Sequence, residues 1–185
     1  RQVSSAASDV YKRQVYGFTS YNDAKDKELN KGLDLKGGIN VILQISIRDI
    51  LSGLAENTKN PIFNKALDEA DLLQKSSDAP YIESFFDAFD LIKSGAKLAS
   101  PDIFANRTLS DEINFEMNDK ETQVIIRRKI DESIVSAFEV LRKRIDKFGV
   151  TQPNIQRLGS SGRILVELPG AKDVDRVQNL LQSTA

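Results

Sequence analysis

Residues 120–148, KETQVIIRRKIDESIVSAFEVLRKRIDKF, decide the fold of this 185-residue chain, because no other segment has so regular an apolar pattern. Apolar side chains recur there at intervals of three or four residues, at Ile126, Ile130, Ile134, Phe138, Leu141, Ile145 and Phe148. This spacing predicts one long amphipathic helix with a buried stripe. Gly149 follows directly and predicts the end of the helix.

Two short strands are predicted on the C-terminal side of this helix, over residues 154–158 and 163–168. In the second strand, Ile164, Val166 and Leu168 are predicted to face the core, while Arg163 and Glu167 face out. The four residues between the strands, GSSG, predict a turn, and Pro169-Gly170 ends the second strand. Asp173 predicts the cap of a further helix.

A strand is also predicted on the N-terminal side of the helix, because Ile39, Val41, Leu43 and Ile45 fall on one face of an extended chain and Asn40 and Gln44 on the other. Gly37-Gly38 at its start permits a bulge or the close approach of another backbone. The functional alternative is a phosphate-binding loop, but such loops precede a helix and this one precedes a strand.

Residues 51–120 predict a mainly helical insertion. Helices are expected up to about Leu54, from Asn60-Pro61 to Leu73, and from Tyr81 to Ile92. Phe85, Phe86 and Phe89 lie on one side of the last of these. They predict either a local core or, if the rings are exposed, an apolar groove for extended polypeptide. Residues 96–118 predict loops with short elements.

The order of these elements predicts an α+β chain with a ferredoxin-like unit, β-α-β-β-α, whose final strand is missing and whose first strand is followed by a helical insertion. The expected divisions are a non-native or disordered leader at 1–14, a first-strand region at 15–50, the insertion at 51–120, and a helix-strand-strand-helix part at 121–185. The unpaired edge that a missing strand would leave predicts that the native protein continues beyond Ala185.

The composition excludes most familiar enzyme sites, because the chain has no His and no Cys. Its formal net charge of −1 gives no overall attraction to nucleic acid or anionic lipid. A basic cluster near the end of the long helix, at Arg142, Lys143, Arg144 and Lys147, is expected to offset the helix dipole. The alternative is contact with anionic headgroups or a partner.

Two motifs carry a resemblance to a known family. The first is Gly32, Leu33, Asp34, Leu35, Lys36, Gly37 and Gly38, and the second includes Arg144, Ile145, Phe148, Gly149, Val150, Pro153, Gln156, Arg157, Glu167, Pro169 and Gly170. Together they resemble the first periplasmic domain of the SecD family of bacterial protein-export membrane proteins, which are often fused to SecF. Lys31 stands where that family usually has an apolar residue.

The resemblance implies an auxiliary subunit of the Sec translocase in the bacterial inner membrane, with this part on the periplasmic side. It implies a role in preprotein translocation driven by the proton-motive force, with SecF, the SecYEG translocon and unfolded preproteins as partners. It implies no catalytic residue, cofactor or metal. Under this interpretation the groove alternative makes Phe85, Phe86 and Phe89 a client contact.

Asp34 in the first motif is expected to pair with Lys36 or Arg157, or to serve as a hinge or partner contact. Two functions of other classes remain as alternatives. One is an acid/base hydrolase that uses Glu167 with Asp34, although no pocket motif surrounds either residue. The other is a ferredoxin-like binding module for RNA or protein that is unrelated to export, although the strands lack an aromatic platform for bases.

Overall fold

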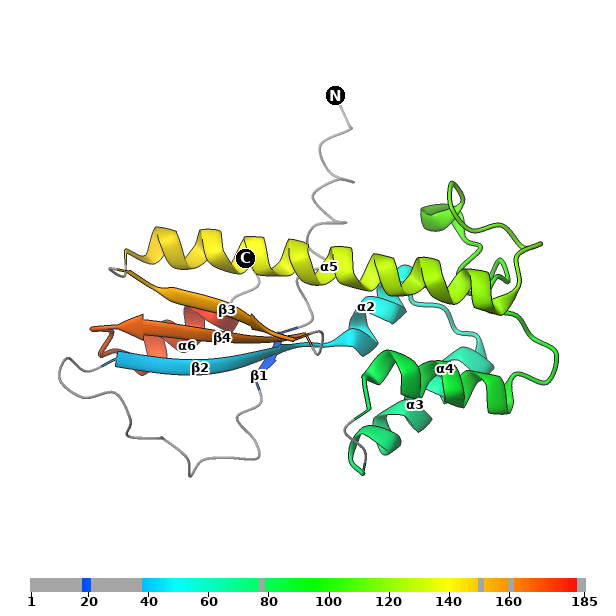
Figure 1. Cartoon of the computed structure of the whole chain (residues 1–185), viewed down its shortest axis with the longest axis horizontal. Coiled ribbons are helices and arrows are strands. Elements are labelled where there is room, and N and C mark those ends of the chain that lie inside the picture. Colours follow the sequence, from blue (N-terminus) through cyan, green and yellow to red (C-terminus); the bar gives the residue numbers. More distant parts are fainter. Residues whose placement is uncertain (1–17, 21–37, 77–78, 150–151, 160–161, 183–185) are drawn as a thin grey trace. The chain divides into compact units, whose positions relative to one another are not determined.

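The computed structural model describes residues 18–20, 38–76, 79–149, 152–159 and 162–182, and these form an α+β chain (Figure 1). The strands are β1 (Phe18–Ser20), β2 (Gly38–Ile45), β3 (Asn154–Leu158) and β4 (Arg163–Pro169). The helices are α2 (Ile47–Leu54), α3 (Pro61–Gln74), α4 (Tyr81–Ile92), the short 3₁₀ helix η2 (Arg107–Leu109), α5 (Asp119–Phe148) and α6 (Val174–Gln182). Among the described residues, no helix combines the length and apolar character of a membrane span.

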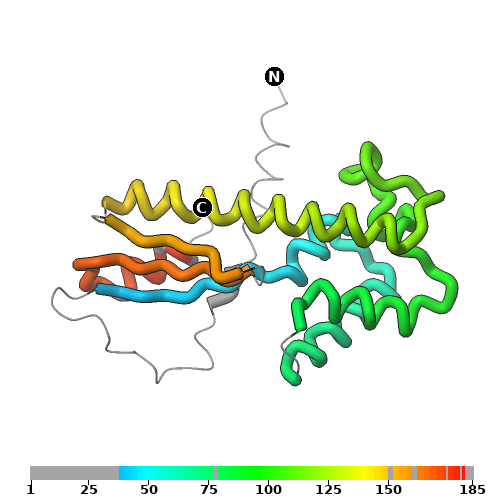
Figure 2. Tube along the Cα trace, in the orientation of Figure 1, coloured from blue at the N-terminus to red at the C-terminus, as the bar shows by residue number. Residues whose placement is uncertain are grey.

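The chain divides into two compact units, which are described separately below. The sheet unit comprises Arg1–Ser46 and Ile134–Ala185, and the helical unit comprises Ile47–Ser133. Helix α5 begins in the helical unit and ends in the sheet unit, as the continuous tube in Figure 2 shows. The helical unit is therefore one uninterrupted segment of sequence, whereas the sheet unit is assembled from two segments.

The sheet has the strand order β1-β2-β4-β3, and all neighbouring strands are antiparallel. Strand β2 pairs with β4 from Gly38 opposite Pro169 to Gln44 opposite Arg163. The predicted hairpin is confirmed, because β3 and β4 pair directly with Leu158 opposite Arg163. The short strand β1 lies on the other side of β2 and pairs only with its last three residues, Leu43, Gln44 and Ile45.

One face of the sheet carries the core of the sheet unit. The predicted inward residues of β4, Ile164, Val166 and Leu168, are fully buried, as are Leu43 and Ile45 of β2. The other buried apolar residues described in this unit lie on the helices, at Ile134, Ala137, Leu141 and Ile145 of α5 and at Val177 and Leu181 of α6. The predicted stripe of α5 is thus confirmed at its isoleucines and Leu141, whereas Phe138 and Phe148 are only half-buried.

The helices of the helical unit begin where the sequence predicts. The side-chain oxygen of Asn60 accepts hydrogen bonds from the backbone N–H groups of Ile62 and Phe63, both at 3.0 Å, so Asn60 caps α3. Pro61 occupies the first turn, where its missing N–H costs no helical hydrogen bond. Apolar residues recur every three or four positions along α3. Of these, Phe63, Ala66, Leu67 and Ala70 are buried, whereas Leu73 near the end of the helix is 41% exposed.

Five phenylalanine rings form the centre of the helical unit. Phe63 contacts Phe85 and Phe104 edge-on, with ring centroids 5.5 and 5.7 Å apart, and Phe85 also contacts Phe86 and Phe89. The exposed fractions of Phe85, Phe86 and Phe89 are 0%, 2% and 0%. The local-core interpretation is therefore confirmed. A client contact at these three rings is wrong, because it required exposed rings and the neighbouring aromatic rings help to cover them.

Gly38 at the start of β2 lies close to the backbone at the end of β4. A Cβ atom at this position would lie 3.2 Å from the carbonyl oxygen of Leu168 and 3.4 Å from the Cα of Pro169. Both neighbours are backbone atoms, which cannot rotate away as a side chain can. The close-approach interpretation of Gly38 is therefore confirmed, and this glycine sets the spacing at one end of the β2–β4 pair.

Replacing Phe85 by alanine should destabilise the helical unit by about 3–5 kcal/mol, because the substitution leaves a cavity among the rings. The matched control is Leu91→Ala, also in α4, whose side chain is 85% exposed. It should change stability by less than about 0.5 kcal/mol. Chemical denaturation followed by circular dichroism measures both. Equal effects of the two substitutions would contradict the packing described here.

Replacing Gly38 by alanine should destabilise the sheet unit by about 1 kcal/mol or more, because the added methyl group presses on the backbone of β4. Gly53→Ala provides the opposite control. Nothing lies within 4 Å of a Cβ at Gly53 in α2, so this substitution should stabilise its helix by roughly 0.5–1 kcal/mol. Thermal unfolding of the two variants should shift in opposite directions, and a stabilising Gly38→Ala would disprove the close contact.

Candidate functional site

The two sequence motifs meet at one end of the sheet, where β2 begins, β4 ends and β3 begins. This arrangement follows from the antiparallel register, which places Gly38 opposite Pro169 and Asn154 opposite Glu167. We call this place the motif end and define it by Gly38, Asn154, Glu167, Pro169 and Gly170. Of the first motif, only Gly38 belongs to the described residues, and Gly32, Leu33, Asp34, Leu35, Lys36 and Gly37 lie outside them.

The helical part of the second motif ends α5 and contributes to the core. Ile145 is fully buried, whereas Arg144 and Phe148 are half-buried. The guanidinium of Arg176 in α6 lies 4.8 Å from the centre of the Phe148 ring, in a cation–π contact between two helices. Gly149 then has φ = +78°, a left-handed conformation that stops the helix. Val150 lies outside the described residues.

A polar row crosses the open face of the sheet at the motif end. Asn40, Glu167 and Asn154 are neighbours in the register of β2, β4 and β3. The amide nitrogen of Asn154 donates a hydrogen bond to a carboxylate oxygen of Glu167 at 2.5 Å, and the amide of Gln156 donates to the side-chain oxygen of Asn154 at 3.1 Å. Pro153, just before β3, is half-buried, and Arg157 is exposed.

The polar row is held by hydrogen bonds that side-chain amides donate. The described partner of Glu167 is the amide of Asn154, and an amide neither takes up nor releases a proton near neutral pH. The proposed pairing of Glu167 with Asp34 involves a residue outside the described ones, as does the predicted pairing of Asp34 with Lys36 or Arg157. The hydrogen bond between Asn154 and Glu167 therefore links the side chains of β3 and β4.

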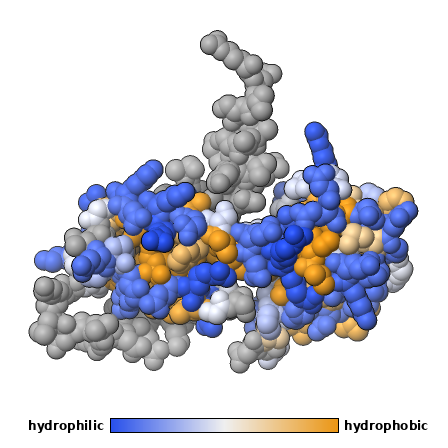
Figure 3. Space-filling model, turned by 45° about the horizontal axis from the view of Figure 1, so that its top comes forward, coloured by the Kyte–Doolittle hydropathy of each residue, from blue (hydrophilic) through white to orange (hydrophobic). Residues whose placement is uncertain are grey.

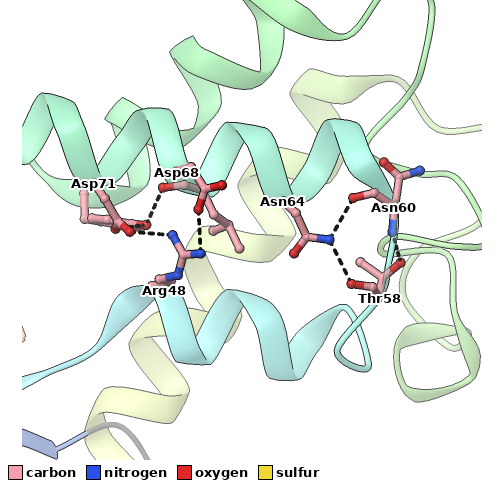
Figure 4. A network of polar contacts seen from close by, with 8 residues as sticks. Arg48, Thr58, Asn60, Asn64, Asp68 and Asp71 are labelled. Atoms are coloured by element: carbon pink, nitrogen blue, oxygen red, sulfur yellow. Dashed lines mark hydrogen bonds and ion pairs between the residues drawn. The ribbon is translucent and has the colours of Figure 1, made fainter.

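The helical unit contains a second polar cluster, which joins α2, α3 and α4 (Figure 4). Arg48 donates to Asp71 at 2.5 Å and to Asp68 at 2.8 Å, so two α3 carboxylates share one guanidinium. The Tyr81 hydroxyl donates to the other oxygen of Asp71 at 2.8 Å. Burial and this hydrogen bond raise the pKa of Tyr81, so its hydroxyl stays protonated. This cluster ties three helices together and offers no nucleophile.

A neighbouring group of amides and hydroxyls fixes the start of α3 (Figure 4). The backbone N–H of Asn60 donates to the Thr58 hydroxyl at 3.1 Å, and the Asn64 amide donates to the carbonyls of Asn60 and Thr58. Asn60 also donates to Asp102 at 2.5 Å, and this bond, with one from Ser100, lowers the pKa of Asp102. The sequence predicted a helix start at Asn60-Pro61 but not the contact with Asp102, because that residue lies 42 positions away along the chain.

The rest of the described surface has a mixed character. Within the described part of the chain, no three His, Cys, Asp or Glu residues gather as metal ligands would. The face drawn in Figure 3 is a mixture of hydrophilic and hydrophobic residues. The most exposed large apolar side chains of the helical unit are Leu91, Phe115 and Val124. The motif end is therefore the candidate functional site, because both sequence motifs contribute to it.

Comparison with known proteins finds a family match and several relatives. Residues 134–185 match the family described as "Protein translocase subunit SecDF, P1 domain, N-terminal". The chain is 33% identical to protein translocase subunit SecD of Rhodothermus marinus over 172 residues, which are 91% of this chain and 26% of that protein. It is 30% identical to SecD of Acetobacter pasteurianus over 169 residues, covering 86% of this chain and 32% of that one.

A more distant relative, SecD of Escherichia coli K12, is 26% identical over 159 residues, or 83% of this chain and 25% of that protein. The chain thus spans between a quarter and a third of the length of these relatives. No solved structure gives a significant match. The matches to SecD extend over most of the chain and include both units. The chain belongs to the SecD family of protein translocase subunits, and it contains the N-terminal part of the P1 domain.

Proposed function

We propose that this chain is the extracytoplasmic part of an auxiliary subunit of the Sec translocase, which helps preproteins to cross the bacterial inner membrane and to leave it on the far side. One observation carries the proposal. The match to the P1 domain begins at residue 134, where the second segment of the sheet unit, Ile134–Ala185, also begins. The region matched by the family model thus coincides with the second segment of the sheet unit, which supports a shared role.

We extend the proposal to the fold of the sheet unit, which we assign to the ferredoxin-like class. In that class the chain order is β-α-β-β-α-β. Strands β2, β3 and β4 with helices α5 and α6 supply the first five elements in this order. Strand β1 lies beside β2, on the side where the fourth strand of a ferredoxin-like sheet would pair. The neighbour relations in the sheet support the assignment.

In this proposal the chain contributes structure and a contact surface to export, and the proton-motive force acts through membrane-embedded parts of the subunit. SecF, the SecYEG translocon and unfolded preproteins are the proposed partners. The motif end is suited to a geometric role, because its residues fix strand spacing and turns. Gly38 permits the close approach of two strands, and Gly170 has φ = +74° in the turn after β4.

The proposal can be tested by grafting. Residues 38–182 should replace the aligned segment of E. coli SecD, and preprotein export should be measured in cells depleted of their own SecD. We expect the graft to restore export, because the two proteins are 26% identical over 159 aligned residues. Failure of a graft that accumulates in the membrane at the normal level would contradict the proposal.

A matched control distinguishes a folded but inactive graft from a misfolded one. Ile145→Asp places a charge in the core of the sheet unit and should abolish export together with protease resistance. Lys147→Asp also introduces an acidic residue near the end of α5, but on its exposed side, and should leave protease resistance unchanged. Loss of export in the graft without loss of protease resistance would refute the proposed function.

The nucleic-acid alternative leads to a separate prediction. Strands β2, β3 and β4 contain no aromatic residue on which a base could stack, and the chain has a formal net charge of −1. We therefore expect no retention on an immobilised oligonucleotide even at low salt, where charge attraction is strongest. Retention that decreases steeply as salt is added would favour an RNA-binding module instead.

A further inference from the structure

The two units differ in how they are assembled from the chain. The helical unit is one uninterrupted segment, Ile47–Ser133, so its folding does not require distant segments to meet. The sheet unit does require this, because β2 pairs with β4 across the whole length of the helical unit. The helical unit therefore has the simpler requirement, and its own contacts decide whether it is stable without the sheet unit.

The helical unit has a hydrophobic core of its own. More of the buried apolar residues described in the chain lie in this unit than in the sheet unit, and they include all the described phenylalanines that are buried. The turns between α4 and α5 contribute to the same core, because Leu98, Ile103 and Phe104 are fully buried. Burial of apolar side chains is the main driving force of folding. The helical unit thus contains its own source of stability.

Buried polar groups of the helical unit find partners inside it. The side-chain amide of Asn106 donates hydrogen bonds to the carbonyl oxygens of Leu54 and Ile103, both at 2.7 Å. The hydroxyl of Thr122, a buried residue at the start of α5, donates to the carbonyl oxygen of Asn118 at 2.9 Å. A buried polar group that loses its partner is costly. Opening of the sheet unit would leave both of these groups bonded, because their partners belong to the helical unit.

Ion pairs attach the first half of α5 to the helical unit. Arg127 of α5 donates two hydrogen bonds to Glu83 of α4, both at 2.8 Å, and its guanidinium also lies 4.8 Å from the centre of the Phe86 ring. Lys93, just after α4, contacts Asp119 at the start of α5 at 2.8 Å. All these partners lie within the helical unit. The first half of α5 is therefore held by contacts that do not involve the sheet unit.

We propose that the helical unit is a self-sufficient folding domain, which stays folded together with the first half of α5 when the sheet unit opens. The chain then has a partly open state in which the pairing of β2 with β4 is lost. The second half of α5 unravels in this state, because Ile134, Leu141 and Ile145 lose the core in which they are buried. This inference goes beyond the proposed function and does not depend on it.

The first test places a charge in the core of the sheet unit of the 185-residue chain, isotope-labelled for amide NMR. Val166→Asp, at a fully buried position of β4, should open the sheet unit. We expect the signals of β2, β3 and β4 to collapse into the range of unfolded chains and those of α3 and α4 to keep their positions. The matched control is Val135→Asp in α5, where the side chain is 45% exposed, and it should leave both units folded. Collapse of the α3 and α4 signals in Val166→Asp would overturn the proposal.

The second test uses a variant that stays folded. Val166→Ala removes two methyl groups from the same core position and should weaken the sheet unit without unfolding it. Amide hydrogen exchange at increasing urea concentration gives a midpoint of opening for each residue. We expect the midpoint to fall for Ile164 and Leu168 of β4 and to stay unchanged for Phe85 and Phe89 of α4. An equal fall at all four residues would show that the chain opens as one cooperative unit and would refute a self-sufficient helical domain.

Discussion

The antiparallel pairing of β2 with β4 is the interaction on which the rest of the sheet unit depends. It joins two segments that are separated in sequence by the whole helical unit. The entropy cost of closing so long a loop grows only slowly with its length, so an inserted unit of this size is tolerated. The cost is offset by burial of Leu43, Ile164 and Val166 on one face of the pair. Strands β1 and β3 then attach to its two sides.

This pairing also explains why the motifs contain the residues they do. Gly38 lies where a Cβ would press on the backbone of β4, and Pro169 is its partner across the register. Gly149 and Gly170 have positive φ, so each turns the chain in a way that other residues adopt at a cost. The described glycines of the motifs thus set the spacing and direction of the chain. Their spread along the sequence reflects an antiparallel sheet whose neighbouring strands come from distant segments.

Periodicity predicted the regular elements from the sequence, because a buried face repeats every two residues in a strand and every three or four in a helix. It identified α5, the β3–β4 hairpin and the inward residues of β4. It could not predict the core role of residues 96–118, where Leu98, Ile103 and Phe104 are fully buried within turns that have no period. Nor could it find the Arg48 cluster, whose partners lie 20 and 23 residues away. The alternative of an aromatic groove was wrong, because Phe63, from another segment, packs against both Phe85 and Phe104.

The two units differ in what holds them together. The sheet unit buries one face of its sheet, and on the opposite face the polar side chains of Asn154 and Glu167 hydrogen-bond between two strands. The helical unit is built instead around phenylalanine rings that are closed to solvent. A closed core offers no surface to a partner, so a contact made by the helical unit would have to use exposed side chains such as Leu91 and Phe115.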